Sequence, residues 1–180
     1  VVVGSYVELA DQQLALILKE KKCTGIEISV EHLKKIFQNP LNNLQLLDLA
    51  SNYYEEIKLV LLEKKTPIVY TSRGEMLFSS SDEKNAFGIF LAEFMAGLTA
   101  QVTPLVGYVI TKGGVTTHVF LEKGLKLNSV HLVGQLLPGL SVVCAKENLR
   151  SKDLPIITFP GNLGQKETLL TSWKLMESLI

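Results

Sequence analysis

Short apolar runs alternate with longer segments of helical periodicity through most of this chain. Apolar or alternating residues predict strands, and these lie at 1–3, 25–30, 68–72 and 105–110. Apolar positions spaced three or four residues apart predict helices, and these lie at 8–22, 31–37, 44–65 and 82–98. Strands that alternate with helices in this way indicate a parallel sheet with helices on both faces.

The later part of the chain is richer in strands. A short helix is predicted at 118–123, strands at 129–133, 142–145 and 156–159, and a closing helix at 165–180. The turn signal Leu137-Pro138-Gly139 separates two of these strands at close range, which favours antiparallel pairing. The predicted fold is therefore α/β, with a mostly parallel sheet flanked by helices on both faces and a strand-rich, partly antiparallel later portion.

Size and charge narrow the classes of function. The 180 residues are 47% hydrophobic, which suits one domain over residues 1–180 with a full core. Eighteen basic residues balance eighteen acidic ones, so no basic field argues for nucleic acid. The apolar stretches read as too short or too interrupted to span a bilayer, and no signal peptide is evident. We expect a cytoplasmic protein that binds neither nucleic acid nor membrane.

The cysteines and histidines give little indication of metal binding or redox chemistry. The two cysteines are far apart in sequence, and Cys144, in an apolar run, is predicted to be a small core residue. The three histidines show no metal-ligand spacing. Because Val1-Val2-Val3 reads as a strand already under way, we expect a piece of a longer protein, cut before its first strand.

A glycine-rich run near the middle of the chain is the strongest chemical signal. Thr111-Lys112-Gly113-Gly114-Val115-Thr116-Thr117 lies between a predicted strand and a predicted helix. Glycines let the backbone approach an anion and aim N–H groups at it, and a helix begins with free N–H groups. This arrangement favours phosphate binding. The alternative is a tight turn with Thr116 as the helix N-cap, since the run lacks the Walker pattern.

Three other polar turns follow predicted strands: 4–5, 71–74 and 160–164. In a parallel sheet such turns gather at one edge, where ligands bind, so we expect them to share a crevice. Arg73 could pair with phosphate oxygens or form a surface salt bridge. A strong acid/base pair is missing, and we do not expect Glu75 to hold a metal ion.

The order of these motifs resembles a known family. Val-Gly-Ser at 3–5 is followed by Gln13-Leu14, by Gly113-Gly114-x-Thr116, by Gly-Gln-Leu-Leu-Pro-Gly at 134–139, and by Phe-Pro-Gly-Asn-Leu-Gly at 159–164. In this order, and over essentially the entire chain, they resemble the C-terminal nucleotide-binding domain of the four-carbon acid sugar kinases, which act on threonate, erythronate or oxo-tetronates.

The resemblance implies an ATP-binding half of such a kinase, with Mg²⁺ as a further cofactor. The acid sugar would bind a separate N-terminal domain, absent from this chain, and the catalytic residues stay unidentified. The positions that match nucleotide-contacting ones are Ser5, Gly113, Gly114, Val115, Thr116 and Gly161. Val7 and Ala10 stand where the family pattern often has hydroxyl residues.

Two alternatives of other classes stay open at this point. The first is a non-catalytic domain that binds a nucleotide or sugar phosphate and regulates a partner. The second is a structural α/β interaction module whose glycine turns bind nothing. The protein could form a homodimer under any of these interpretations.

Overall fold

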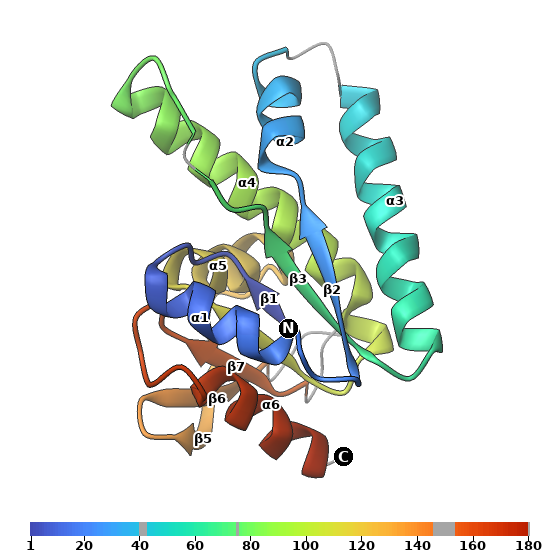
Figure 1. The fold of residues 1–180 in the computed structure, drawn as a ribbon, viewed down its shortest axis with the longest axis vertical. Coiled ribbons are helices and arrows are strands. Elements are labelled where there is room, and N and C mark those ends of the chain that lie inside the picture. The colour runs from blue at the N-terminus through green and yellow to red at the C-terminus, as the bar shows by residue number, and fades with distance from the viewer. Residues whose placement is uncertain (40–42, 75, 146–153, 180) are drawn as a thin grey trace.

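Seven strands form one mixed sheet at the centre of the molecule (Figure 1). The computed structural model describes residues 1–39, 43–74, 76–145 and 154–179. The strands are β1 (Val2–Val3), β2 (Cys23–Ile28), β3 (Thr66–Thr71), β4 (Val109–Lys112), β5 (His131–Leu137), β6 (Leu140–Cys144) and β7 (Ile156–Phe159). The helices are α1 (Glu8–Ile17), α2 (Val30–Phe37), α3 (Asn43–Leu62), α4 (Ser81–Val102), α5 (Gly114–Val119) and α6 (Thr168–Ser178).

The spatial order of the strands is β2-β3-β1-β4-β7-β6-β5. The first five are parallel to one another. β6 runs antiparallel to β7, and β5 runs antiparallel to β6. This confirms the predicted α/β class, including the antiparallel portion near the end of the chain.

Alternating side chains of the central strands build a core on each face of the sheet. Val3 and Ile110 point to the side covered by α1 and α6, where they pack with residues such as Trp173. Val2 points to the opposite side, into a core formed with α2, α3 and α4. Helices therefore cover both faces, as predicted, and the ligand-accessible part of the sheet is its edge at the strand ends.

Element boundaries near the glycine run differ from the prediction. β4 is Val109–Lys112, later than the predicted 105–110, because Thr103–Leu105 is a short 3₁₀-helix with a proline in its first turn. The helix predicted at 118–123 begins earlier, with α5 starting at Gly114, and continues as a π-helical segment, Phe120–Gly124. Parallel pairing of Thr111 and Lys112 with β1 and β7 extends the strand through polar residues.

The expectation that every apolar stretch is too short or too interrupted to span a bilayer needs a correction, since the helical segment Ser81–Leu105, which contains α4, is long and apolar enough to cross a membrane. Its buried residues, however, include Phe87, Met95 and Leu98, which form part of the core between α4 and the sheet. A core helix of a globular domain passes the same test, and we interpret α4 as such a helix.

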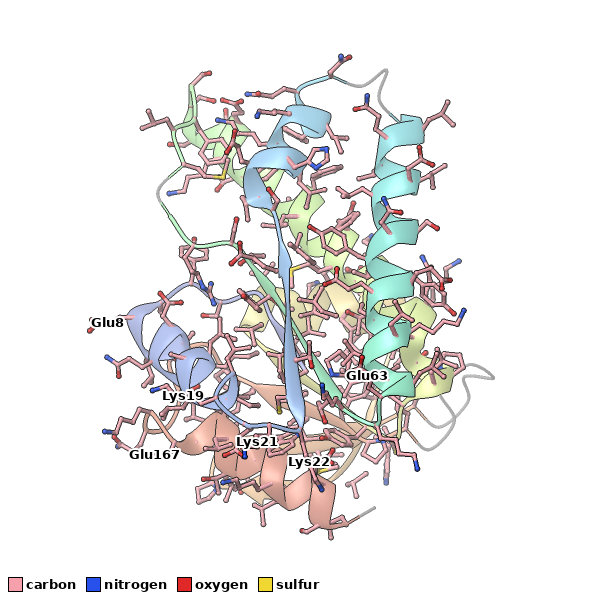
Figure 2. All side chains as sticks on the ribbon, turned by 45° about the vertical axis from the view of Figure 1, so that its right-hand side comes forward. Glu8, Lys19, Lys21, Lys22, Glu63 and Glu167 are labelled. Carbon is pink, nitrogen blue, oxygen red and sulfur yellow. The ribbon has the colours of Figure 1, made fainter. Side chains whose placement is uncertain are left out.

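Charged side chains of both signs are spread over the surface (Figure 2), where Glu8 begins α1, Lys19 follows the end of α1, and Glu167 precedes α6. The cysteines are free. The prediction for Cys144 needs a correction: it is half-buried, whereas Cys23 is the buried thiol.

Candidate functional site

Three adjacent parallel strands, β1, β4 and β7, end side by side at one edge of the sheet. The Ser5 N–H donates to the Lys112 carbonyl over 3.3 Å, and the Gly113 N–H donates to the Phe159 carbonyl over 2.8 Å. A β-carbon built on Gly161 would lie 2.6 Å from Ser5 Oγ and 4.0 Å from the Gly113 Cα. The predicted convergence of Ser5, Gly113 and Gly161 is therefore confirmed, although they are far apart in sequence.

The two adjacent glycines, Gly113 and Gly114, differ in backbone conformation and in surroundings, which the sequence did not indicate. Gly113 has φ +119° and is the N-cap of α5, a backbone conformation that favours glycine. Gly114 has no positive φ, and a β-carbon there would meet nothing within 4 Å. Gly113, and not Gly114, therefore occupies the backbone conformation that requires glycine.

Two threonines fix the turn from within. Thr116 is not the N-cap; it lies in the first turn of α5, buried, and its Oγ1 would be 2.0 Å from a β-carbon on Gly4 and 3.1 Å from one on Gly113. Thr117 Oγ1 donates to the Gly113 carbonyl over 2.8 Å. Val115, by contrast, is exposed at the surface. The turn is thus closed underneath by Thr116 and Thr117, and its outer side carries Gly114 and Val115.

Gln13 of α1 anchors the loop that follows β7. It is fully buried, and its Nε2 donates to the Leu163 carbonyl over 3.1 Å and to the Gln165 carbonyl over 2.8 Å. Sequence reasoning noted Gln13 as part of a motif without giving it a role. One signal was available: Gln13 precedes the apolar Leu14 in a helix with one apolar face. This position suggests burial, and a buried amide needs hydrogen-bond partners.

Lys112 is a buried residue of this edge that sequence reasoning did not single out as a site residue. It is fully buried at the end of β4, where its Nζ donates to the carbonyls of Pro160 and Gly161 over 3.0 and 3.1 Å. The ammonium also lies 3.8 Å from the centre of the Phe159 ring. Burial lowers the pKa of Lys112 to about 8. The floor of the site therefore contains a lysine whose charge is sensitive to pH.

Arg73, after β3, reaches the same edge from the other side. Its Nη1 donates to the Ser5 carbonyl over 2.9 Å, and its Nε lies 2.9 Å from Asp11 Oδ1. Arg73 Nε and Asp11 Oδ1 form an ion pair, but their geometry is not that of a hydrogen bond. Arg73 Nη2 is buried and has no hydrogen-bond partner among the described residues. Arg73 therefore forms the salt bridge that was one of its two predicted roles. One nitrogen of its guanidinium, Nη2, still has no acceptor in the described part of the protein.

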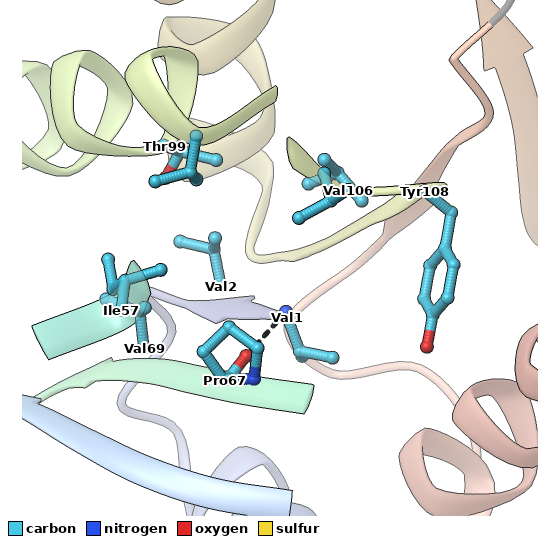
Figure 3. A pocket seen from close by; sticks show the side chains of 10 residues that line it. Val1, Val2, Ile57, Pro67, Val69, Thr99, Val106 and Tyr108 are labelled. Carbon is cyan, nitrogen blue, oxygen red and sulfur yellow. Dashed lines mark hydrogen bonds between the residues drawn. The ribbon is translucent and has the colours of Figure 1, made fainter. Parts of the chain in front are cut away.

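The described residues contain no group of three or more His, Cys, Asp or Glu side chains that could hold a metal ion. Glu75 lies outside the described residues. A small cavity of about 30 Å³ exists at the opposite end of the strands, lined by residues such as Val2, Ile57 and Val106 (Figure 3). Its apolar walls offer no polar set that could orient a ligand.

Comparisons with known proteins place the chain in a family. Residues 1–169 match the model of a nucleotide-binding C-terminal domain. A search among curated proteins finds no significant match. A similar crystal structure is a domain of unknown function from Bordetella bronchiseptica, a domain-swapped dimer with bound citrate; the identity is 16% and the TM-score 0.70, over 97% of this chain and 39% of that one.

A protein from Salmonella typhimurium LT2, assigned only provisionally as a tRNA synthase, is similar over 94% of this chain and 38% of its own, with 17% identity and a TM-score of 0.63. At these identities the two structures support the fold, and this chain spans about two fifths of their length. The family model covers nearly all of the chain. This protein belongs to the family of nucleotide-binding C-terminal domains.

Proposed function

We propose that this domain is the ATP-binding half of a kinase that phosphorylates a four-carbon acid sugar such as threonate, erythronate or an oxo-tetronate. The observation that carries the proposal is the meeting of Ser5, Gly113 and Gly161 at one edge of the sheet. Membership of a nucleotide-binding family supports a nucleotide as the ligand. The acid sugar is inferred from the resemblance of the motifs, and it would bind a separate domain.

The residues at this edge fit a phosphate group. Gly161 lies so close to Ser5 that a β-carbon would be 2.6 Å from Ser5 Oγ, and glycine permits such close approach of the backbone, to a neighbour or to an anion. Arg73 holds a buried guanidinium nitrogen without a protein partner, and guanidinium groups bind phosphate oxygens well. We propose that the phosphates contact Ser5, Gly161 and the outer side of the 113–116 turn.

ATP would supply the transferable phosphoryl group, with Mg²⁺ neutralising charge on its oxygens. The chain's own residues would position those phosphates, because phosphoryl transfer depends mainly on positioning and electrostatic stabilisation. No metal ligand set is proposed in this domain. Asp11, the carboxylate described at this edge, pairs with Arg73, so we expect the group that activates the sugar hydroxyl to lie on the acid sugar domain.

A second candidate is a non-catalytic domain that senses a nucleotide or a sugar phosphate. The engagement of Asp11 by Arg73 favours it, because this carboxylate is then held by the protein itself and is not free to contact a substrate hydroxyl. Both candidates use the same phosphate site. They differ in whether a phosphoryl group leaves it.

A thermal-shift series on the 180-residue chain tests the proposal. ATP, ADP, AMP and sugar phosphates would each be added with and without Mg²⁺. We expect ATP and ADP to raise the melting temperature, since a ligand present at 100 times its Kd stabilises the folded state by about 2.7 kcal/mol. Stabilisation by sugar phosphates alone would favour the sensing domain, and no stabilisation by any phosphate compound would contradict both candidates.

The kinase assignment needs a second measurement. We expect the isolated domain to bind ATP or ADP without phosphorylating threonate or erythronate, and the full-length protein to phosphorylate one of the acid sugars. Robust acid sugar kinase activity of the 180 residues alone would overturn the proposed division of labour. A full-length protein that binds ATP but phosphorylates no acid sugar would overturn the substrate class.

A further inference from the structure

Lys112 is an unusual residue for the core of this domain. It is among the largest side chains that are fully buried. Its ammonium contacts two carbonyl oxygens, those of Pro160 and Gly161, and the face of the Phe159 ring. None of the carboxylates in the described part of the chain lies within ion-pair distance of it. A buried charge normally has a partner of opposite sign, so this lysine needs an explanation.

The two carbonyls that Lys112 binds determine how the loop after β7 is oriented. Pro160 begins a turn in which the Leu163 N–H donates to the Pro160 carbonyl over 3.3 Å. In a planar trans peptide the N–H points opposite to the C=O. Because the carbonyls of Pro160 and Gly161 point at Lys112, the N–H groups of Gly161 and Asn162 point away from it.

Those two N–H groups are free to bind an anion. Among the described residues, neither donates a hydrogen bond to the protein. Gly161 is half-buried next to Ser5, and Asn162 is exposed. Successive backbone N–H groups in a turn form a concave anion site. Here that site has a positive charge directly behind it.

We propose that Lys112 is a positioning residue of the phosphate site, which holds the Pro160–Asn162 turn so that the N–H groups of Gly161 and Asn162, backed by the buried ammonium, bind a phosphate of the nucleotide. The inference rests on the proposed nucleotide function and adds to it the groups that meet the phosphate. The anion would supply the negative charge that Lys112 lacks within the protein.

The proposal predicts how nucleotide affinity depends on pH. Loss of the Lys112 proton removes the charge behind the turn, so nucleotide affinity should fall as pH rises through about 8, the pKa of Lys112 in the ligand-free domain. Arg73 and Asp11, the charged pair at this edge, contact Ser5 and each other. The terminal phosphate, with a second pKa of about 6, is already fully ionised there.

The stability of the ligand-free domain should change in the opposite direction. Between about 8 and the ordinary value of 10.5, the unfolded chain keeps a proton on Lys112 that the folded domain has lost, so stability rises with pH. Burial raises the pKa of the Cys23 thiol from 9.0 to about 12, which makes stability fall with pH above 9. Burial also lowers the pKa of the Val1 amino group from 8.0 to about 6, which makes stability rise with pH up to about 8. Between about pH 8 and 9 the residual contributions of Val1 and Cys23 oppose each other, so the remaining rise in stability is mainly that of Lys112.

The test measures binding of ADP and of inorganic pyrophosphate by calorimetry between about pH 7.5 and 9, with amide NMR of the loop in the same samples. The variant is Lys112→Gln, which keeps donors and removes charge. The matched control is Lys166→Gln, an exposed lysine beyond the same loop. Loss of one charge-assisted contact should weaken binding about tenfold.

The expected result is an affinity that falls with pH in the wild type and in Lys166→Gln, a weaker and pH-independent affinity in Lys112→Gln, and movement of the Gly161 and Asn162 amide signals by either ligand. The opposite pH trend of wild-type stability needs no variant, so a poorly folding Lys112→Gln does not remove the test. Equal affinity and equal pH profiles in wild type and Lys112→Gln would overturn the proposal.

The remaining outcomes separate this inference from the proposed function. ADP binding that leaves the Gly161 and Asn162 signals unmoved would overturn the role of Lys112 and keep the nucleotide function. Pyrophosphate binding with the expected pH profile, but no ADP binding, would keep the role of Lys112 and overturn the nucleotide. Binding of neither ligand would overturn both.

Discussion

The two ends of the parallel strands are built in opposite ways. At the carboxyl ends, Ser5, Gly113 and Gly161 meet through backbone and small side chains. At the amino ends, large side chains fill the space: Tyr108 Oη donates to Glu177 over 2.7 Å, and Trp173 Nε1 donates to Thr66 over 3.0 Å. Among the described residues, one end leaves backbone N–H groups without protein acceptors, while the other pairs its polar side chains with each other.

The small cavity lies at the filled end, which shows that hollowness alone does not mark a functional site. Its walls are mostly valine, isoleucine and proline, and the hydroxyl of Thr99, one of its few polar groups, already donates to the Met95 carbonyl over 2.7 Å. At the other end the signals are backbone N–H groups and charge. Substitutions that affect one end and not the other test this distinction.

The largest effect is expected from Gly161→Val. A β-carbon at this position would lie 2.6 Å from Ser5 Oγ, so a branched side chain would clash with Ser5 and displace the turn that carries the Gly161 and Asn162 N–H groups. Losing contacts of about 1.5–3 kcal/mol each should reduce ADP affinity at least tenfold and up to several hundredfold. The matched control is Gly134→Val on β5, where a β-carbon meets nothing within 4 Å.

Calorimetry with ADP compares these two variants with the wild type. Gly134→Val should bind as the wild type does. Unchanged affinity of Gly161→Val, in a variant that melts cooperatively, would remove the loop after β7 from the site.

Gln13→Leu should have the next largest effect. It removes the two hydrogen bonds that the buried Gln13 amide makes to the Leu163 and Gln165 carbonyls, which should cost about 1–3 kcal/mol. Gln12→Leu is a matched neighbour, because Gln12 is exposed and its amide contacts only Glu8. Urea unfolding should therefore separate the two variants clearly. A stability loss of the same size in both would show that the loop does not depend on Gln13.

The glycine pair provides a comparison within one turn. Gly113→Ala places a side chain at φ +119°, with its β-carbon 3.3 Å from the Ser5 nitrogen, which should destabilise the domain by about 1–2 kcal/mol. Gly114→Ala lies at the open start of α5 and should be neutral or slightly stabilising. Thermal denaturation of the two variants checks this order, and a larger loss for Gly114→Ala would contradict the assignment of the strained position.

The smallest effect should come from the filled end. Tyr108→Phe removes the hydrogen bond to Glu177 and should lower stability by about 1 kcal/mol, with no change in ADP affinity. Urea unfolding and calorimetry on the same protein measure both quantities. A change in affinity larger than the change in stability would show that the two ends are coupled.

The sequence predicted much of the fold because its patterns are local. Alternating apolar residues and helical periodicity located the strands and helices. The rule that parallel strands end at one edge of a sheet predicted that Ser5, Gly113 and Gly161 lie close together. The prediction ended β4 at Ile110, since Thr111 and Lys112 are polar. Their pairing with β1 and β7 depends on distant segments, which periodicity does not report.

The buried roles of Lys112 and Gln13 were unpredictable for the same reason. The carbonyls that Lys112 binds lie 48 and 49 residues further along the chain, and those that Gln13 binds lie 150 and 152 residues further along. Nothing in a local window distinguishes such a lysine from a solvated one. The choice of Gly113 over Gly114 likewise depends on where α5 begins, which is the least reliable part of a sequence-based assignment.

The most direct test of the central claim is amide NMR of the domain titrated with ADP and, separately, with adenosine, which has no phosphate. The account predicts that ADP moves the amide signals of Ser5, Gly113 and Gly161 together and that adenosine leaves them in place. Signals near Tyr108 and Glu177 should not respond to either ligand. ADP-dependent changes confined to that opposite end, or changes at Ser5, Gly113 and Gly161 that adenosine reproduces in full, would contradict a phosphate site built from the three strand ends.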